Sequence, residues 1–510
     1  NTHGCLPDGS GYGAPEACAP EAPVCWEDAC VTCLPGSVVC ADEGSAQSCL
    51  PDGSGYGAPV PCEVEEECQV GVCVNLCVLA EGSPSSEGCS FFTLKMDNFY
   101  NNASDPSHND GMIVANPHPT KTAVAQLYFV ANDTSVEVAS GAPVDIPPLG
   151  SHAFEIGNPE IDSVSLRRSG GVYRLQSSLP VMAIHSSPGS PGSTNEAMLL
   201  LPEHAHGRHY VVASYPGLAG SYPSYFTAIG LVTGTTLGFE VSASTAAGVG
   251  VPQVLAGQTG TVTLDRFTTL NVVVEQQMGG DLSGTIVSAD QPVWLAGATE
   301  CANVPNASTY YCDYIAELMI PLECWGAEYV GAHAPLRSAA ERFYWRVYGG
   351  ADGVTVQTDP AQAGFPVVLA KGEFVTLDTT ENLVFLGDGP FLPVQYLQGG
   401  YSIGSGDPAM LLAVPTEQYL QAYTFVSLAG YSTSYAQIVR SVGGAPVLLD
   451  GVPVGGFVSV GAYEVSNVVV TTGVHVASSI EPFGAAVFGF TNVSSYAFPA
   501  GTKLEKINAP

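Results

Sequence analysis

The sequence predicts an all-β protein in which tandem immunoglobulin-like β-sandwiches follow small disulfide-rich modules. First, 58 Gly and 38 Pro with only 12% charged residues favour short strands and tight turns over long helices. Second, segments such as "AQLYFVAN" (125–132), "FYWRVYG" (343–349) and "GVTVQTD" (353–359) have the Val, Thr and aromatic content of sandwich strands. Third, cysteines are concentrated near the start. A β-propeller with two blades per repeat would also fit and remains the alternative.

The cysteines predict a disulfide framework formed in an oxidising compartment. A zinc module would need paired C-x2-C knuckles, and only Cys30 and Cys33 have that spacing. The twelve cysteines expected to form disulfides here are Cys5, Cys18, Cys25, Cys30, Cys33, Cys40, Cys49, Cys62, Cys68, Cys73, Cys77 and Cys89. We expect Cys77 to pair with Cys89 because the two bracket a short, turn-rich loop.

The stretch "CLPDGSGYGAP" occurs at 5–15 and again, identically, at 49–59. The cysteines that follow each copy match at offsets of 43 or 44, which indicates a duplicated module of about 44 residues. Such a module is too small to bury a core, so disulfides must stabilise it. Its Pro, Asp and Gly residues are turn chemistry, so the identity is structural. We place module 1 at 1–33 and module 2 with its junction at 34–89.

The remaining residues repeat a longer unit of roughly 90–110 residues, the size of one sandwich. Pro-Val occurs at 180, 292 and 393, and a Pro at 202, 321 and 415 precedes a Tyr by eight residues each time. We expect Pro-Val to open the last strand of each domain, and the "AMLL…P" segment to link it to the next. The predicted β domains are 90–200, 201–319, 320–413 and 414–510, the last with a C-terminal tail.

The charge of the chain excludes one class of partner. There are 14 Lys and Arg against 48 Asp and Glu, a net charge of −34. Nucleic-acid binding needs clustered Lys and Arg, so it is not expected. No window is long and apolar enough to span a membrane. The acidity is explained by solubility, with scattered Ca²⁺ sites as an alternative that no D-x-D-x-D-G loop supports. No cofactor is expected.

Three long segments carry a family resemblance. The residues 301–330 ("CANVPNASTYYCDYIAELMIPLECWGAEYV"), 406–427 ("GDPAMLLAVPTEQYLQAYTFVS") and 482–501 ("PFGAAVFGFTNVSSYAFPAG") resemble the IgGFc-binding protein N-terminal domain family, and 76–99 resembles its myxobacterial members. The resemblance implies an extracellular, non-enzymatic binding or adhesion protein at a bacterial, Gram-negative cell surface, with a protein or glycan partner. It also implies that Cys301 pairs with Cys312, which leaves Cys324 either as a buried free thiol, the interpretation we favour, or as a cross-link.

Three catalytic or metal patterns are weaker than their structural explanations. "GYSIG" (400–404) fits G-x-S-x-G around Ser402, but two Gly and a Pro follow where a nucleophile elbow needs a helix. "EHAHGRH" places His204, His206 and His209 beside Glu203, yet the sister repeats have no His there. Asp105 and Asp110 flank a sequence typical of a turn, with Ca²⁺ binding as the alternative. We therefore predict no enzymatic activity.

The C-terminal tail suggests a second function. Lys503 and Lys506 alternate with Leu504 and Ile507, whereas residues 1–94 contain no Lys or Arg. An extended tail can add to a strand edge of a neighbour, and head-to-tail contacts that do not close form a fibre. The alternative function is therefore a structural subunit of an extracellular filament or sheath, a homopolymer assembled through Lys503, Leu504, Lys506 and Ile507.

Overall fold

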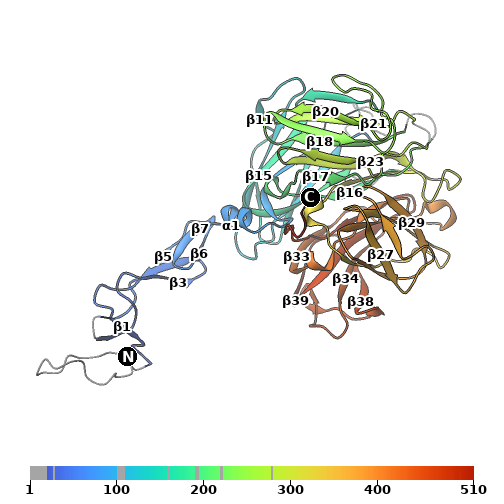
Figure 1. Cartoon of the computed structure of the whole chain (residues 1–510). Helices are drawn as coiled ribbons and strands as arrows, with labels where there is room; N and C mark the ends of the chain where they lie inside the picture. The colour runs from blue at the N-terminus through green and yellow to red at the C-terminus, as the bar shows by residue number, and fades with distance from the viewer. Residues whose placement is uncertain are drawn as a thin grey trace, which may run out of the picture. The chain divides into compact units, whose positions relative to one another are not determined.

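The computed structural model confirms the all-β prediction (Figure 1). It describes residues 20–26, 29–99, 109–157, 161, 163–189, 194–218, 222–276 and 279–509. The chain separates into two compact units, residues 1–83 and 84–510, which are described in turn.

The first unit consists of short antiparallel hairpins and one helical segment. Three disulfides join Cys33 to Cys49, Cys40 to Cys68 and Cys62 to Cys73. Its elements are β1 (Val24–Trp26), β2 (Ala29–Val31), β3 (Val38–Asp42), β4 (Ser45–Ser48), β5 (Val60–Pro61), β6 (Glu66–Gln69), β7 (Val72–Asn75) and α1 (Leu76–Gly82). We expected module 1 to end at residue 33 and module 2 to begin at residue 34. The Cys33–Cys49 bridge joins these two modules.

The repeated stretch forms a turn in its second copy. Gly53 has φ +68° and its N–H donates to the Leu50 carbonyl oxygen at 2.9 Å, while Asp52 Oδ1 accepts from Ser54. The Gly53 carbonyl oxygen accepts from the Thr32 N–H at 2.8 Å. A Cβ at position 53 would lie 2.7 Å from Val31, so glycine is required both by φ and by space. In the second copy, Gly53 therefore serves the turn and its packing, whereas the first copy (5–15) lies outside the described residues.

Not all predicted disulfide cysteines can be placed. Cys5, Cys18 and the side chain of Cys25 lie outside the described residues. Cys30, Cys77 and Cys89 are each disulfide-bonded, and the pairing of Cys77 with Cys89 stays a prediction.

The second unit contains four β-sandwiches with one topology. Numbering the strands of each sandwich 1–8, one sheet has the order 1-6-3-4 and the other has the order 5-2-7-8, all antiparallel. Each sheet thus takes strands from distant parts of the repeat, as sandwiches do. In the first and fourth sandwiches a single long strand supplies both strands 6 and 7. Two short strands at 137–139 and 144–146 together form strand 4 of the first sandwich, and an additional strand at 458–460 pairs with strand 5 of the fourth.

The strands of the four sandwiches are as follows. The first contains β8 (Gly88–Thr93), β9 (Asp110–Ala115), β10 (Ala123–Val130), β11 (Glu137–Ala139), β12 (Val144–Ile146), β13 (Ser151–Ile156), β15 (Val172–Ser187) and β16 (Glu196–Leu199). Strand β14 (Leu166–Ser169) leaves it to pair with β21 of the second. The second contains β17 (His209–Val211), β18 (Ser224–Gly230), β19 (Thr235–Glu240), β20 (Thr259–Leu264), β21 (Thr268–Val273), β22 (Ile286–Ala289), β23 (Val293–Ala302) and β24 (Asp313–Leu318).

The third and fourth sandwiches continue the pattern. The third contains β25 (Glu328–Gly331), β26 (Phe343–Gly349), β27 (Val354–Asp359), β28 (Val367–Leu369), β29 (Phe374–Thr379), β30 (Leu383–Gly387), β31 (Phe391–Tyr396) and β32 (Met410–Leu412). The fourth contains β33 (Leu420–Ser427), β34 (Thr433–Ser441), β35 (Leu448–Leu449), β36 (Val452–Pro453), β37 (Val458–Val460), β38 (Tyr463–Val470), β39 (Gly473–Phe490) and β40 (Ser495–Pro499).

The eighth strand corrects one sequence interpretation. The "AMLL…P" segments were expected to be linkers after a last strand opened by Pro-Val. They instead form strands β16, β24 and β32, which pair with the Pro-Val strands. The residues of these strands are buried on both faces, so each segment belongs to the core. The four eighth strands pack in a ring, β16 on β24, β24 on β32, β32 on β40 and β40 on β16.

The eight-residue spacing from Pro to Tyr has a hydrogen-bonding cause. Each Pro opens a single 3-10 turn, η2 (Glu203–Ala205), η3 (Leu322–Cys324) or η5 (Thr416–Gln418). The buried hydroxyl of Tyr210 then accepts from the Gly207 N–H at 2.7 Å and donates to the Val293 carbonyl oxygen at 2.8 Å. Tyr329 and Tyr423 accept from the corresponding N–H groups three residues earlier.

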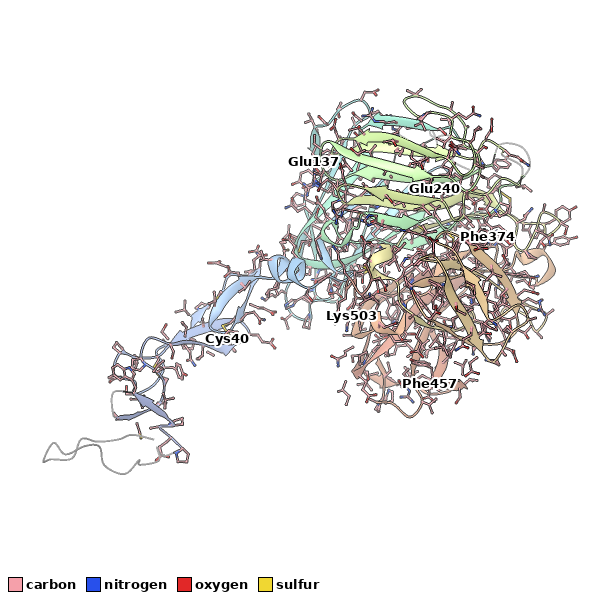
Figure 2. All side chains as sticks on the ribbon, viewed as in Figure 1. Cys40, Glu137, Glu240, Phe374, Phe457 and Lys503 are labelled. Carbon is pink, nitrogen blue, oxygen red and sulfur yellow. A yellow bond between two sulfur atoms is a disulfide. The ribbon has the colours of Figure 1, made fainter. Side chains whose placement is uncertain are left out.

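The C-terminal tail corrects a second expectation. Leu504 is 2% exposed, and its N–H donates to the Pro84 carbonyl oxygen at 3.2 Å. The Lys503 N–H donates to Gln418 and the Ile507 N–H to Glu323. Figure 2 shows Lys503 within the second unit. Because the backbone groups and Leu504 bind within the chain, Lys503, Leu504, Lys506 and Ile507 do not form a free arm for a neighbouring subunit.

Candidate binding site

One pocket receives residues from all four sandwiches, and we call it the shared pocket. Its volume is about 410 Å³. Phe99 comes from the first sandwich, Asp407 from the third and Val493 from the fourth, whereas the second supplies Leu218, Asn303, Ala307, Tyr310, Tyr311 and Cys312. Most of these residues lie in the connections between strands 7 and 8, which meet on one side of the ring of eighth strands.

A disulfide shapes the rim of the shared pocket. Cys301, at the end of β23, is bonded to Cys312, just before β24, as the resemblance implies. The bridge closes the connection between them, so Tyr310 and Tyr311 stand out from it at 63% and 55% exposure. The ring of Tyr401, from the third sandwich, packs edge-on against both, with centroids 5.5 and 5.4 Å away. Two exposed tyrosines therefore line the shared pocket, and the exposed Tyr401 supports them from the third sandwich.

The floor of the shared pocket offers hydrogen-bond acceptors. Asp407 is 3% exposed and Asn303 is 7% exposed. Among the described residues, none donates a hydrogen bond of standard geometry to Oδ1 of either side chain. Burial raises the pKa of Asp407 to about 8, and smaller contributions from the Gly400 N–H and Arg337 lower it. The pocket is thus complementary to a group that brings donors and positive charge.

Further buried carboxyl groups behind the pocket have structural partners. Glu196 Oε2 accepts from the Met410 N–H at 2.8 Å and its Oε1 from the Ala197 N–H, which ties β16 to β32. Asp313 Oδ1 accepts from the Asn195 and Tyr314 N–H groups. Burial raises the pKa of both carboxyl groups well above the usual range. They connect the ring and do not face the shared pocket.

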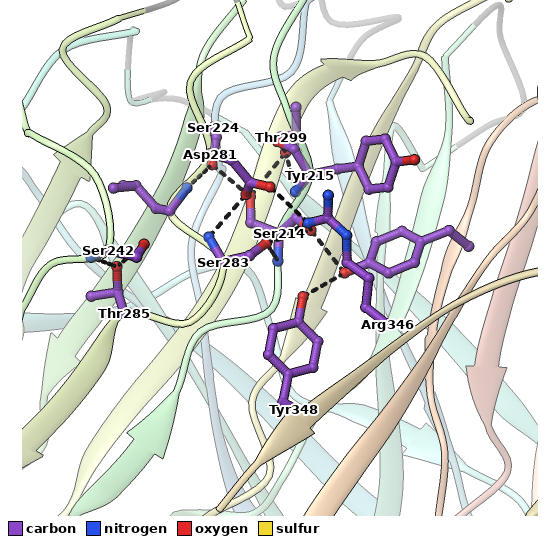
Figure 3. Close-up of polar contacts among 12 residues, drawn as sticks. Ser214, Tyr215, Ser224, Ser242, Asp281, Ser283, Thr285, Thr299, Arg346 and Tyr348 are labelled. Carbon is purple, nitrogen blue, oxygen red and sulfur yellow. Dashed lines mark hydrogen bonds and ion pairs between the residues drawn. The ribbon is translucent and has the colours of Figure 1, made fainter. Parts of the chain in front are cut away.

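The junction between the second and third sandwiches holds a different polar cluster (Figure 3). Arg346 on β26 forms an ion pair with Asp281 at 2.7 Å and donates to the Ser214 carbonyl oxygen at 3.1 Å and to Ser283 Oγ at 2.8 Å. Its guanidinium lies 4.3 Å from the ring centroid of Tyr215, whose pKa burial raises to about 12. Arg346 is 7% exposed and no residue of this cluster lines the shared pocket, so the cluster fastens one sandwich to the next.

The histidine cluster separates into unrelated contacts. His209 Nδ1 lies 2.9 Å from Glu323 Oε1, and Glu203 Oε1 binds Arg266 at 2.6 Å. Burial lowers the pKa of His206 to about 3, so its ring is neutral. Within the described ranges, no three His, Cys, Asp or Glu side chains are grouped to hold a metal ion.

The remaining chemical candidates are also resolved by burial and local structure. Gly400–Ser402 forms one 3-10 turn, without the α-helix of a nucleophile elbow. Asp105 lies outside the described residues, whereas Asp110 Oδ2 is 3.0 Å from His185 Nε2, and His185 Nδ1 is 2.8 Å from Thr93 Oγ1. This hydroxyl–imidazole–carboxylate series is at most 2% exposed, so a substrate cannot reach it. Cys324 is a buried free thiol, as expected, and burial raises its pKa to about 12.

Sequence comparison decides the family. Residues 196–489, more than half of the chain, match the family described as IgGFc binding protein. The chain belongs to this family. It is 24% identical over 343 residues to the human (Homo sapiens) IgGFc-binding protein, which covers 63% of this chain but only 6% of that relative. Asn303, Tyr310, Tyr311 and Asp407 lie inside the family match, whereas Phe99 and Val493 lie outside it.

Two further observations bear on location. The family and the disulfides indicate an extracellular protein. In the part of the chain that the structure describes, no helix combines the length and apolar character needed to cross a membrane.

The shared pocket is not among the sites predicted from the sequence. Its signal was present, because "TYYC" (309–312) places two tyrosines beside a cysteine whose partner closes a short loop. The contribution of Asp407 could not be deduced, because it depends on how the third sandwich lies beside the second.

Proposed function

We propose that this chain is an extracellular, non-enzymatic binding protein that holds a basic side chain of a partner protein in the shared pocket. The observation that carries the proposal is the combination of an exposed tyrosine rim with two buried acceptors, Asp407 and Asn303. Membership of the IgGFc binding protein family supports a binding role with a protein partner.

The chemistry favours lysine or arginine. An ammonium or guanidinium group supplies several donors, which would satisfy Oδ1 of both floor residues. Tyrosine faces attract such cations by roughly 0.5–2 kcal/mol, more when the cation is desolvated. The net charge of −34 attracts a basic partner over longer range. A cation also favours the ionised form of Asp407, so binding releases a proton near neutral pH.

The setting that fits this role is a cell surface, where the chain would act in adhesion. We also propose that this cell is a Gram-negative bacterium, as the family resemblance implies. Immunoglobulin Fc appears in the name of the human relative, and it is one basic-side-chain-bearing protein to include among the trial partners. The filament alternative is not pursued, because its tail residues bind within the chain.

The test uses Nα-acetyl-arginine amide as a defined probe. Calorimetric titration of the full chain at pH 7 should give saturable binding with proton release, measured by repeating it in buffers of different ionisation heat. Asp407→Asn should weaken binding by about tenfold or more, since 1.4 kcal/mol corresponds to tenfold, and should abolish proton release. Asp145→Asn, at an exposed position on β12, is the matched control and should bind as the original chain does.

Two outcomes would count against the proposal. Equal binding by the Asp407→Asn and Asp145→Asn variants would place the probe elsewhere. Binding of methyl glucoside in place of the arginine probe, weakened by Tyr310→Ser and Tyr311→Ser, would assign the pocket to a glycan.

A further inference from the structure

In the first three sandwiches, described residues that follow the first strand lie against the next sandwich. In the second sandwich, Arg346 and Tyr396 of the third both donate to the Ser214 carbonyl oxygen. In the third, Gln437 of the fourth donates to the His333 carbonyl oxygen at 2.7 Å. In the first, Tyr225 of the second donates to the Asp97 carbonyl oxygen at 2.5 Å. Three junctions are therefore filled by the chain itself and fastened by a polar side chain.

The junction from the fourth sandwich back to the first is different. The connections between strands 1 and 2 span 94–109, 212–223 and 332–342 in the first three sandwiches but only 428–432 in the fourth. Five residues replace 11 to 16, so little chain is left to cover the neighbouring sheet.

The residue facing this junction has also changed. Arg346 pairs with Val394, which pairs with Leu412, three residues before Pro415. By the same register Ile113 pairs with Ile184, which pairs with Leu199, three residues before Pro202. Ile113 thus occupies the position of Arg346, and an aliphatic group stands where the second–third junction has its polar clamp.

A pocket of about 360 Å³ remains at this junction, and we call it the junction pocket. Ile113 and Ala153 of the first sandwich face Val426, Leu428, Ala429 and Tyr431 of the fourth. The pocket lies directly beyond Ser427, the last residue of β33, which still pairs with Gly473. In the second sandwich the matching residue is Ser214, and the next side chain, Tyr215, fills the equivalent space by packing on Tyr396 at 4.8 Å.

We propose that the junction pocket binds an extended peptide of a partner protein, with one aromatic or long aliphatic side chain inserted as Tyr215 is inserted at the second–third junction. The internal repeat indicates the occupant. At the other three junctions, the equivalent surface is covered by chain that follows the first strand of a sandwich, so a peptide is expected at the fourth. Ile113 specifies an apolar side chain, because it offers no hydrogen bond. This site is separate from the shared pocket and does not depend on its function.

The probe is a fluorescein-labelled peptide, acetyl-VASYPG-amide, which copies residues 212–217. Fluorescence anisotropy with the full chain should show saturable binding that unlabelled peptide displaces. The same peptide with serine in place of tyrosine should bind about tenfold more weakly or worse. Ala429→Trp fills the pocket from an exposed position and should remove binding, whereas Ala247→Trp, exposed on the second sandwich, should not.

Several results would overturn this assignment. Absence of saturable binding at millimolar peptide, or equal binding by the Ala429→Trp and Ala247→Trp variants, would show that no peptide enters the pocket. A concentration-dependent dimer in sedimentation velocity that Ala429→Trp abolishes would assign the surface to a second copy of the chain. Loss of peptide binding in Asp407→Asn would place the peptide in the shared pocket instead.

Discussion

The two units of this chain are stabilised by different means. In the described residues of the first unit, the buried residues are three cysteines, two glycines, Val31 and Ser45. The second unit buries large aromatic side chains such as Trp294, Trp325 and Trp345, and one continuous core joins its first and fourth sandwiches. The comparison teaches that covalent bonds substitute for a hydrophobic core where a repeat is too short to form one.

Reduction of the disulfides should reveal the largest difference between the two units, because it should unfold the first and leave the second folded. Each of the three bridges within residues 33–73 contributes roughly 3 kcal/mol in the chain-entropy model, so their loss should unfold this segment. Hydrogen-exchange mass spectrometry under a phosphine reductant should show rapid exchange over residues 29–75 while β18, β26 and β34 stay protected. Continued protection of 29–75 would mean that this unit has a sufficient core after all.

Arg346→Ala tests whether polar clamps, as well as apolar packing, hold the second unit. The substitution leaves Asp281, 18% exposed, without the cation it pairs with, which should cost about 3–5 kcal/mol. Arg342→Ala is the control, because its ion pair with Asp378 is about half exposed and should contribute at most about 1 kcal/mol. Denaturant unfolding followed by tryptophan fluorescence measures both, and similar values would show that the clamp adds nothing to the core.

Two apolar residues of the C-terminal tail, one buried and one exposed, test whether the tail packs on the second unit. Leu504→Ala should destabilise the second unit by about 2–4 kcal/mol, because Leu504 is 2% exposed. Ile507→Ala should cost about 1 kcal/mol or less, because Ile507 is 41% exposed. Thermal unfolding gives both values, and an unchanged midpoint for Leu504→Ala would show that the tail is not bound in solution.

Asp407→Asn should produce the smallest effect, visible as pH dependence. Burial raises the pKa of Asp407 to about 8 in the folded chain, above its usual 3.8, so its contribution to stability is present below about pH 4 and lost towards pH 8. Between pH 6 and pH 7 the original chain should lose up to about 1.4 kcal/mol relative to the variant. Unfolding at both pH values measures this difference, and parallel pH profiles would contradict the shift.

The sequence predicted the strands and the repeat but not how the repeats meet. Pro202, Pro321 and Pro415 with their tyrosines revealed the repeat, because each pair belongs to a local turn closed by a hydroxyl three residues from its bonded N–H. The shared pocket and the position of Leu504 depend on contacts between distant repeats, for which a single sequence carries no pattern. In the sequence, Ile113 resembles any other core residue. Only the strand register shows that it occupies the position equivalent to that of Arg346.

The place of the tail also fixes an order of events during synthesis. Thr502 donates to Ser86 Oγ, a hydrogen bond between residues 416 positions apart. Each sandwich can fold from its own neighbouring residues, but this contact waits until residue 502 has been synthesised, roughly 20–80 s after residue 86 at ~5–20 residues per second. Until then the apolar surfaces that join the first and fourth sandwiches are exposed to solvent. The nascent chain is therefore most prone to aggregation in the interval before residue 502 is made, and its earliest sandwich carries that risk longest.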